Sequence, residues 1–196
     1  MKLRRSWYER HAPDVAIDLL GKVLARKLGE ASLRGRIVEV EAYTGREDPG
    51  SHAFRGPTPR SRLMFGPAGH LYVYLSYGMH CCMNVVTDAN GVAGAVLIRA
   101  VEPLVGTQCM ASKRGNRPSN QLCNGPGKLC EAFAITRDQN GADLECSDIW
   151  IEDDGYVVGE MARSLRVGLS AGAELPLRFY LAGSPFVSQR GVRAIP

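Results

Sequence analysis

The sequence predicts a protein of the α/β (α+β) class, a single compact domain around a curved, mostly antiparallel or mixed sheet with a protruding β-hairpin. Several stretches alternate apolar and polar side chains with the period of a strand. Strands and helical stretches do not follow one another regularly enough for a doubly wound parallel sheet. With 196 residues, 45% of them hydrophobic, the chain suits one domain over residues 1–196.

The charge and the cysteines limit the class of protein. The net charge is +4 and the isoelectric point is about 8.8, which is compatible with nucleic-acid binding but does not indicate it alone. The six cysteines form no Cys-x-x-Cys pair, and several lie in apolar runs, where a free thiol packs as a small hydrophobic group. We therefore expect no metal site and a reducing compartment. No cofactor is expected either.

No segment of the sequence indicates export or membrane insertion. The chain begins with MKLRRSWYERH, which lacks the apolar core of a signal peptide, and no run is long enough to span a bilayer. No internal repeat and no low-complexity linker interrupts it. We expect an intracellular, cytoplasmic protein with no membrane partner, and a monomer as the default state.

The first predicted elements precede residue 44. Residues 13–20 predict a short helix, because Pro13 suits a first helical turn and Gly21 suits the position after the last. Residues 22–28 alternate weakly and predict a strand. Residues 34–43 predict a further strand, whose one side carries Arg36, Val38, Val40 and Ala42 and whose other side carries Ile37, Glu39, Glu41 and Tyr43.

Residues 44–69 predict an irregular loop that contains GREDPG, RGPTPR and GPAG. A loop of this length within one domain is usually functional or disordered. It carries His52 and, among its arginines, Arg55, Arg60 and Arg62. These arginines suit phosphate contacts, although a solvated basic loop explains them equally well.

Residues 71–86, LYVYLSYGMHCCMNVV, alternate on both sides of Gly78 and predict a β-hairpin with Tyr77 at or near its tip. A large aromatic residue on an exposed tip is unusual. One interpretation, favoured without further information, is that the ring folds back as a lid on its own hairpin. The other is a wedge that enters something flat, such as a base stack.

The second half of the chain predicts shorter elements. We expect a buried strand at residues 93–101 and a mobile, polar and basic segment at residues 114–124. Helices are predicted at residues 104–113 and 127–135, and short strands near residues 149–151, 166–169 and 177–182.

Two glutamates on one face of the strand at residues 34–43 are candidates for acid–base chemistry. For Glu39 we favour a solvent-facing position at the strand edge. Glu41 differs, because Tyr43 follows it on the same face and a Gly- and Arg-rich loop comes next. Partial burial beside aromatic rings brings the pKa of a carboxyl group toward working pH. Glu41 is therefore a candidate general base, with ordinary solvent exposure as the alternative.

Other polar residues lie in apolar surroundings. Arg99 is inside an apolar strand, where a guanidinium needs a partner such as Glu41. Asn84 is either a satisfied amide or a group that reads the edge of a ligand. His52 can act as a general base, as a stacking surface or as a hydrogen-bonding anchor of the loop, and the last is the usual role of a lone histidine. We interpret His80 as structural.

Residues 125–128, GPGK, open one of the predicted helices. Exposed backbone N–H groups at such a start can hold a phosphate with Lys128 beside it. The glycine spacing and the leucine after Lys128 exclude a P-loop. We interpret the segment as a helix start that can contact an anion.

Long motifs follow one another along the chain; in order, they are LLGKVLARKL, RGRIVEVEAYTGREDPGSH, LYVYLSYGMHCCMN, VLIRAVEPL, LCNGPGKLCEAFAI, RVGLS and LRFYLAGSPFVS. Through these motifs nearly the whole chain resembles the alkyladenine (3-methyladenine) DNA glycosylase family of eukaryotes and many bacteria. Motifs of this length in this order are highly specific. Two residues depart from the family pattern: His80 stands where a tyrosine is common, and Gly127 replaces a serine.

The resemblance implies a single-domain, monofunctional glycosylase that flips a damaged purine out of double-stranded DNA and hydrolyses its N-glycosidic bond. It implies that Glu41 is the general base, that Arg99 helps to hold the attacking water, and that the backbone carbonyl of Val167 contacts this water. It surrounds the flipped base with Tyr43, His52, Tyr74 and Asn84, of which Asn84 disfavours guanine. It assigns the DNA contacts to Tyr77 as the wedge and to Met79, Arg55, Thr58, Arg60, Arg62 and Lys128.

The resemblance also limits the reaction. The matched motifs offer no lysine as a Schiff-base nucleophile, so strand cleavage is not expected. The expected substrates are 3-methyladenine, 7-methylguanine, hypoxanthine and ethenoadenine, and in a bacterium the enzyme would act at the nucleoid. Two alternatives stay open: a non-catalytic binding module for distorted duplex DNA, and an enzyme that acts on free nucleosides or nucleotides.

Overall fold

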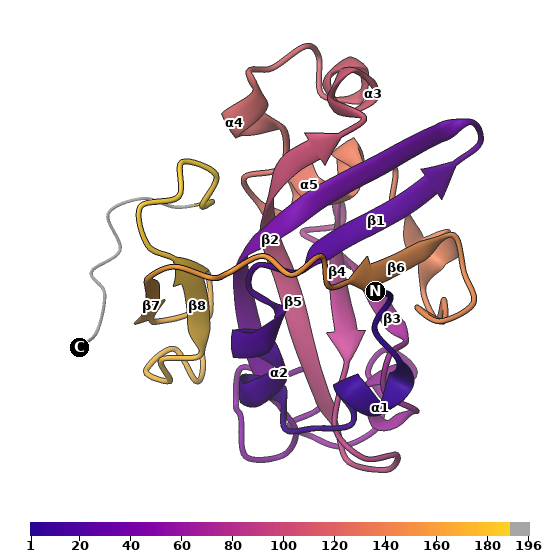
Figure 1. Cartoon of the computed structure of the whole chain (residues 1–196). Coiled ribbons are helices and arrows are strands. Elements are labelled where there is room, and N and C mark those ends of the chain that lie inside the picture. The colour runs from indigo at the N-terminus through magenta and orange to yellow at the C-terminus, as the bar shows by residue number, and fades with distance from the viewer. Residues whose placement is uncertain (189–196) are drawn as a thin grey trace.

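The computed structural model describes residues 1–188, so the expected domain end at residue 196 lies outside the described residues. Within that part of the chain, eight strands form one sheet in the order β3–β4–β5–β2–β1–β6, and β8 joins β2 and carries β7 (Figure 1). Every pairing between these strands is antiparallel. The predicted single α/β domain around a mostly antiparallel sheet is confirmed.

The strands are short except for the two at the centre of the sheet. They are β1 (Val23–Leu28), β2 (Ala31–Thr44), β3 (Leu71–Ser76), β4 (His80–Val86), β5 (Gly94–Val105), β6 (Ile149–Glu152), β7 (Met161–Ser164) and β8 (Arg178–Leu181). The helices are α1 (Arg5–Tyr8), α2 (Ala12–Leu19), α3 (Thr107–Lys113), α4 (Ser119–Leu122) and α5 (Pro126–Ala132), with 3-10 turns at Arg62–Phe65 and Arg137–Gln139.

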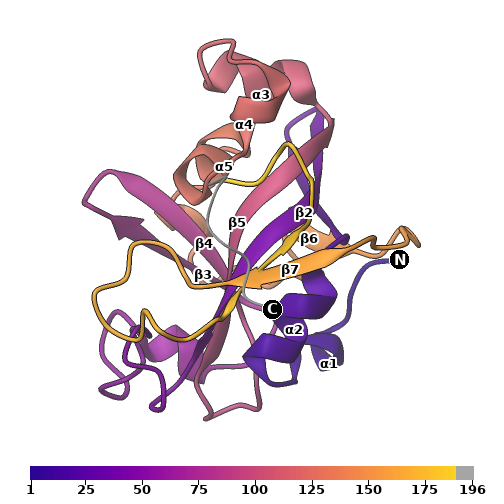
Figure 2. The same ribbon diagram turned by 90° about the vertical axis from the view of Figure 1, so that its left-hand side faces the viewer.

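The long strand β2 organises the sheet. One of its edges pairs with β5, and the other pairs first with β1 and then with β8. The pairing register between β2 and β5 shifts on both sides of Glu39. Such a shift is a β-bulge, an extra residue in one of the two strands, and it bends the strand that carries it. The bend allows Ile37 and Val38, which are neighbours in the sequence, both to enter the main core. Figure 1 shows β2 running from the β1 hairpin toward β8. Figure 2 shows α3, α4 and α5 grouped together at one end of the sheet.

Two apolar clusters hold the domain together. In the main cluster, side chains of α2 and α5 pack against those of the sheet, as expected for amphipathic helices on one face of a sheet. The smaller cluster consists of Ala53, Met64, Tyr72, Val86, Ala93 and Ala95, and the rings of Tyr43 and Tyr74 pack against it. The smaller cluster therefore fixes the loop at residues 44–69 against β2, β3 and β4.

Two local predictions are wrong. Residues 104–105 continue β5 instead of starting a helix, and α3 begins at Thr107 after Gly106 turns the chain with a φ of 77°. The strand expected at residues 166–169 is a loop, because the backbone N–H of Val167 bonds to a side chain rather than to a neighbouring strand. The remaining predicted elements are present within a few residues of their expected bounds, and α1, α4 and β7 were not predicted.

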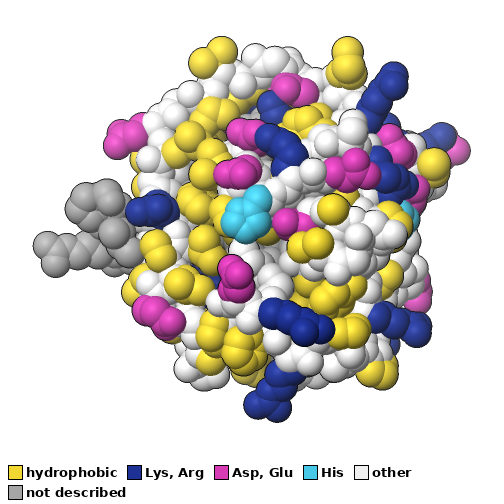
Figure 3. All heavy atoms as spheres, turned by 90° about the horizontal axis from the view of Figure 1, so that it is seen from below, with side chains coloured by type: hydrophobic (Ala, Val, Ile, Leu, Met, Phe, Trp, Pro, Cys, Tyr) yellow, Lys and Arg dark blue, Asp and Glu magenta, His cyan; other side chains and the backbone are white. Residues whose placement is uncertain are grey.

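The surface has mixed charge. Figure 3 shows one face, on which Lys and Arg side chains are interspersed with Asp, Glu and apolar groups. Within residues 1–188, no helix is long and apolar enough to cross a membrane. In the same range, no three His, Cys, Asp or Glu side chains come together as metal ligands.

Candidate active site

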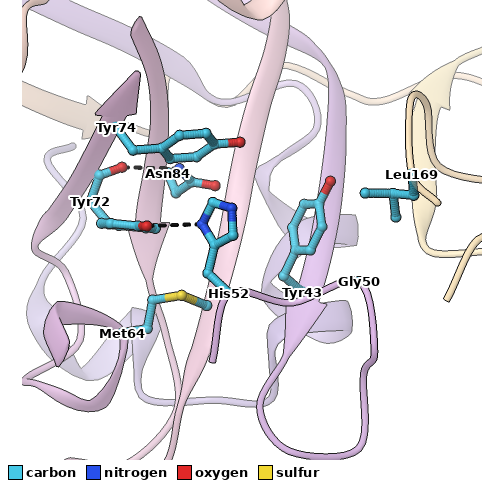
Figure 4. A pocket seen from close by; sticks show the side chains of 8 residues that line it. All are labelled: Tyr43, Gly50, His52, Met64, Tyr72, Tyr74, Asn84 and Leu169. Carbon is cyan, nitrogen blue, oxygen red and sulfur yellow. Dashed lines mark hydrogen bonds between the residues drawn. The ribbon is translucent and has the colours of Figure 1, made fainter. Parts of the chain in front are cut away.

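An aromatic pocket opens where the loop at residues 44–69 crosses β2, β3 and β4. It is lined by Tyr43, Gly50, His52, Met64, Tyr72, Tyr74, Asn84 and Leu169. Figure 4 shows the rings of His52 and Tyr43 on opposite sides of the opening, with Tyr72 and Tyr74 on the side of His52. A slot between aromatic walls suits a flat, unsaturated ligand.

The His52 wall is fixed by its neighbours. Nδ1 of His52 lies 2.9 Å from the hydroxyl of Tyr72, and its ring meets Tyr74 edge to face with centroids 4.6 Å apart. Burial, together with the nearby charge of Arg60, lowers the pKa of His52 to about 4. The imidazole is therefore neutral at pH 7, and it offers the pocket an uncharged ring.

Asn84 presents an amide to the same pocket. It is buried, and its Nδ2 donates a hydrogen bond of 3.0 Å to the backbone carbonyl of Tyr72. Figure 4 shows its side-chain oxygen on the other side, turned toward the space between His52 and Tyr43. One end of the amide is thus occupied by the protein, and the other end is available to the edge of a ligand.

Glu41 lies on β2 behind the Tyr43 wall and is fully buried. Its Oε2 accepts hydrogen bonds from the Tyr43 hydroxyl at 2.8 Å and from Nη1 of Arg99 at 3.2 Å. Its Oε1 accepts a third, of 2.7 Å, from the backbone N–H of Val167. These donors fix the carboxylate and leave Oε1 able to accept one more hydrogen bond. The predicted pairing of Arg99 with Glu41 is confirmed; the contact of the Val167 carbonyl with a water stays a prediction.

The solvent-facing position predicted for Glu39 is wrong, because β8 covers this edge of β2 and Glu39 is fully buried. Its Oε1 accepts hydrogen bonds from Nε of Arg99 at 2.9 Å and from Nε of Arg178 at 2.8 Å. The backbone N–H of Ser188 donates to Oε2 at 2.5 Å. Burial by itself raises the pKa of Glu39, but the two arginines outweigh it and the pKa is lowered. Glu39 thus holds Arg99 at a second point, beside Glu41.

The turn between β3 and β4 consists of Tyr77, Gly78 and Met79, and the first two have positive φ, 50° and 68°. Glycine adopts a positive φ without cost, but a tyrosine there is strained. The side chain of Tyr77 is 85% exposed and that of Met79 is 73% exposed. The ring therefore does not fold back as a lid, and its action as a wedge stays a prediction.

The residues expected to contact DNA outside the turn are exposed. The guanidinium of Arg60 lies 5.0 Å from the ring centre of Tyr74, Thr58 exchanges hydrogen bonds with Ser61, and Lys128 donates one to Asn124. Arg55 and Arg62 lie on the same loop as Arg60. Their contacts with a phosphate backbone stay predictions.

His80 and Gly127, the two residues that the sequence led us to expect as departures from the family pattern, lie against each other. A Cβ added at Gly127 would lie 3.0 Å from Cβ of His80, which is tighter than ordinary packing. A residue without a side chain at the start of α5 therefore makes room for His80 at the base of the β3–β4 hairpin. His80 and Gly127 are thus a single structural feature.

Several residues that build the site were not predicted from the sequence. Tyr72 lines the pocket, and its alternation with Tyr74 on β3 was a usable signal. Asp48 and Arg166 form a fully buried ion pair beside Tyr43. They are 118 residues apart, so no local pattern could have joined them.

Comparisons with known proteins show the family of the chain. The family model for methylpurine-DNA glycosylase (MPG) matches residues 6–185. Relatives at 47% identity come from Methanoculleus marisnigri, covering 97% of this chain and all of the relative, and from Koribacter versatilis, covering 95% and 92%. A relative from Alkaliphilus oremlandii is 45% identical over 97% of this chain and all of its own length. Each of the three bears the name "Putative 3-methyladenine DNA glycosylase".

The chain belongs to the methylpurine-DNA glycosylase family, a class of hydrolases that act on N-glycosyl bonds. The expected enzyme class and its place in DNA repair are confirmed at this level, and DNA is the partner that the family implies.

Proposed function

We propose that this protein is a monofunctional glycosylase of base excision repair. It flips an alkylated or deaminated purine out of double-stranded DNA, hydrolyses the N-glycosidic bond with a water activated by Glu41, and leaves an abasic site. The observation that carries the proposal is the link between pocket and carboxylate: Tyr43 lines the pocket and donates to Glu41 at 2.8 Å.

Glu41 is suited to act as the general base. Its negative charge is held by Arg99 and by the N–H of Val167, and Oε1 can accept a hydrogen bond from a water. As the water oxygen bonds to C1′ of the sugar, Glu41 takes the proton and the purine leaves with the electron pair of the broken C–N bond. A cationic purine departs as a neutral base, so a single carboxylate is sufficient for such lesions.

The aromatic walls determine which bases the pocket prefers. Alkylation at N3 or N7 makes a purine cationic, and the rings of Tyr43, Tyr74 and neutral His52 attract a cation stacked between them. The oxygen of Asn84 faces the edge of such a base. We propose the substrate class of 3-methyladenine, 7-methylguanine, hypoxanthine and ethenoadenine, with undamaged guanine disfavoured at Asn84.

The hairpin turn supplies the wedge. Flipping costs a few kcal/mol of stacking and pairing, and an aromatic ring that fills the gap compensates part of this cost. Tyr77 and Met79 present exposed side chains to the duplex at the turn. Arg55, Thr58, Arg60, Arg62 and Lys128 would hold the phosphate backbone on both sides of the flipped nucleotide. We propose that the protein does this as a monomer, inside the cell and without strand cleavage.

The test is base release under single-turnover conditions from duplexes that carry hypoxanthine or 7-methylguanine. We expect wild type to release the base and to leave alkali-labile sites, and Glu41→Gln to lose at least a hundredfold in rate while still binding the duplex. Glu47→Gln is the matched control, because Glu47 is an exposed glutamate six positions along the chain. If wild type and Glu41→Gln both bind damaged duplex and neither releases a base, the protein is a binding module.

A further inference from the structure

An ion pair is buried behind the Tyr43 wall, outside the reacting groups. Nη1 and Nη2 of Arg166 lie 2.5 and 2.6 Å from the two carboxylate oxygens of Asp48, and both side chains are fully buried. Arg166 also donates to the backbone carbonyls of Ala42 at 3.0 Å and Gly172 at 2.9 Å. A guanidinium held at four points has one orientation, and it keeps its charge because arginine does not lose its proton in proteins.

This guanidinium lies on the face of a pocket wall. Its Cζ is 4.6 Å from the ring centre of Tyr43. Arg166 does not line the pocket, whereas His52 across the opening does. The cation therefore covers the face of Tyr43 that is turned away from His52, and the other face is available to a base.

We propose that Asp48 and Arg166 set the charge preference of the pocket, an inference that rests on the proposed function. A bare guanidinium on one face of Tyr43 would draw electron density from the ring and repel a cationic purine stacked on the other face. Asp48 cancels this charge while leaving Arg166 to hold the ring in place. Asp48 and Arg166 are positioning residues that determine specificity through Tyr43.

The burial of Arg166 explains why its counterion is built into the protein. On the opposite wall, Arg60 lies 5.0 Å from the ring centre of Tyr74 but is exposed. Water and a DNA phosphate can reach Arg60 and screen its charge. Neither can reach Arg166, so only a side chain of the protein itself can neutralise it.

The experiment compares a cationic with a neutral lesion in the same variants. Duplexes carry 7-methylguanine or hypoxanthine, and single-turnover excision gives the ratio of the cationic to the neutral rate. The same ratio is measured for equilibrium binding with the 2′-fluoro forms of both nucleotides, whose glycosidic bonds resist hydrolysis. Asp48→Asn keeps the size of the side chain and its acceptor for Gly50 while removing the charge.

We expect Asp48→Asn to lower the cationic-to-neutral ratio about tenfold in both measurements, as one uncompensated charge at this range predicts. Asp48→Asn combined with Arg166→Gln removes both charges and should return the ratio to within about threefold of wild type. The matched control is Asp153→Asn, which also removes a carboxylate from an ion pair, here with Lys22. Asp153 follows β6, at the opposite end of the sheet from β3 and the pocket, so the ratio should not change.

Equal losses for both lesions in Asp48→Asn would reduce the pair to a structural role and overturn the inference. If Asp48→Asn does not fold, Arg166→Lys keeps the charges balanced and Arg166→Gln leaves Asp48 negative, so only Arg166→Gln should raise the ratio. Equal ratios in these two variants would overturn the inference. If wild type excises neither base, the proposed function fails, and the binding ratios with the 2′-fluoro duplexes still decide the role of the pair.

Discussion

The hydroxyl of Tyr43 donates a hydrogen bond of 2.8 Å to Oε2 of Glu41 two residues before it on β2. Successive odd positions of a strand lie on one face, so the pocket wall and the candidate base come from a single segment. Burial and the charge of Glu41 raise the pKa of Tyr43 far above its ordinary value, which keeps the phenol protonated and able to donate.

Tyr43→Phe removes this hydrogen bond and keeps the ring. We expect the excision rate to fall by about tenfold, because a hydrogen bond to a charged group contributes about 1.5–3 kcal/mol, while affinity for an uncleavable duplex changes by less than threefold. Tyr156→Phe, at an exposed tyrosine outside the pocket, is the control for the loss of a hydroxyl. Equal losses of rate and affinity would contradict a role for the hydroxyl at Glu41.

Tyr77→Ala tests the wedge. We expect excision from duplex DNA to fall at least tenfold, because the flipped state loses the ring that fills the stack, while hydrolysis of a free damaged nucleoside is unchanged. The free energy of unfolding should change by less than about 0.5 kcal/mol, since the side chain is 85% exposed. Val157→Ala, at a side chain that is 86% exposed, is the control. Retention of full duplex activity would contradict the role of Tyr77 as a wedge.

Glu39→Gln tests the buried network around Arg99. Removing one member of a buried charge network costs about 3–5 kcal/mol, so we expect a loss of this order in the free energy of unfolding at pH 7. Asp154→Asn breaks the solvent-accessible pair with Arg36 and should cost no more than about 1 kcal/mol. Urea unfolding at pH 7 measures the loss in the free energy of unfolding for each variant. Equal losses in the two variants would contradict a stabilising role for the buried network around Arg99.

The same network predicts an acid dependence. The pKa of Glu39 is lowered in the folded state, because Arg99 and Arg178 outweigh the effect of burial. The unfolded chain therefore binds this proton first as the pH falls below the ordinary value of 4.5. The contribution of ionised Glu39 to the free energy of unfolding is therefore complete above pH 4.5, and it is lost as the pH falls through the pKa of Glu39 in the folded protein. Glu39→Gln should lack this part of the acid dependence in urea titrations between pH 5 and 3.

His52 predicts a second pH effect in a higher range. Burial and Arg60 lower its pKa to about 4 from the ordinary 6.5, so between these values the unfolded chain binds the proton and the folded chain does not. Stability should therefore decline as the pH falls from about 6.5 to 4, and His52→Gln should show a smaller decline. Excision of 7-methylguanine should weaken near pH 4, where a charged ring faces a cationic base. His11→Gln, at an exposed histidine outside the aromatic pocket, is the control and should keep the wild-type profile.

The sequence by itself determined the strands on both sides of Gly78, the long strand that carries Glu41, and the pairing of a buried Arg99 with an acid. Each of these follows from neighbours in the chain, through alternation, a turn residue or one charge in an apolar run. The long motifs added the family, which the comparisons confirm over residues 6–185.

The tertiary structure alone decided the position of Glu39 and the surroundings of Tyr43. A strand pattern does not say which strand covers its edge, so only the pairing of β8 with β2 buries Glu39 against Arg178. The ion pair of Asp48 with Arg166 joins segments 118 residues apart. Such contacts depend on how the loops close over the sheet, because the free energy that buries and orients them comes from packing between distant segments.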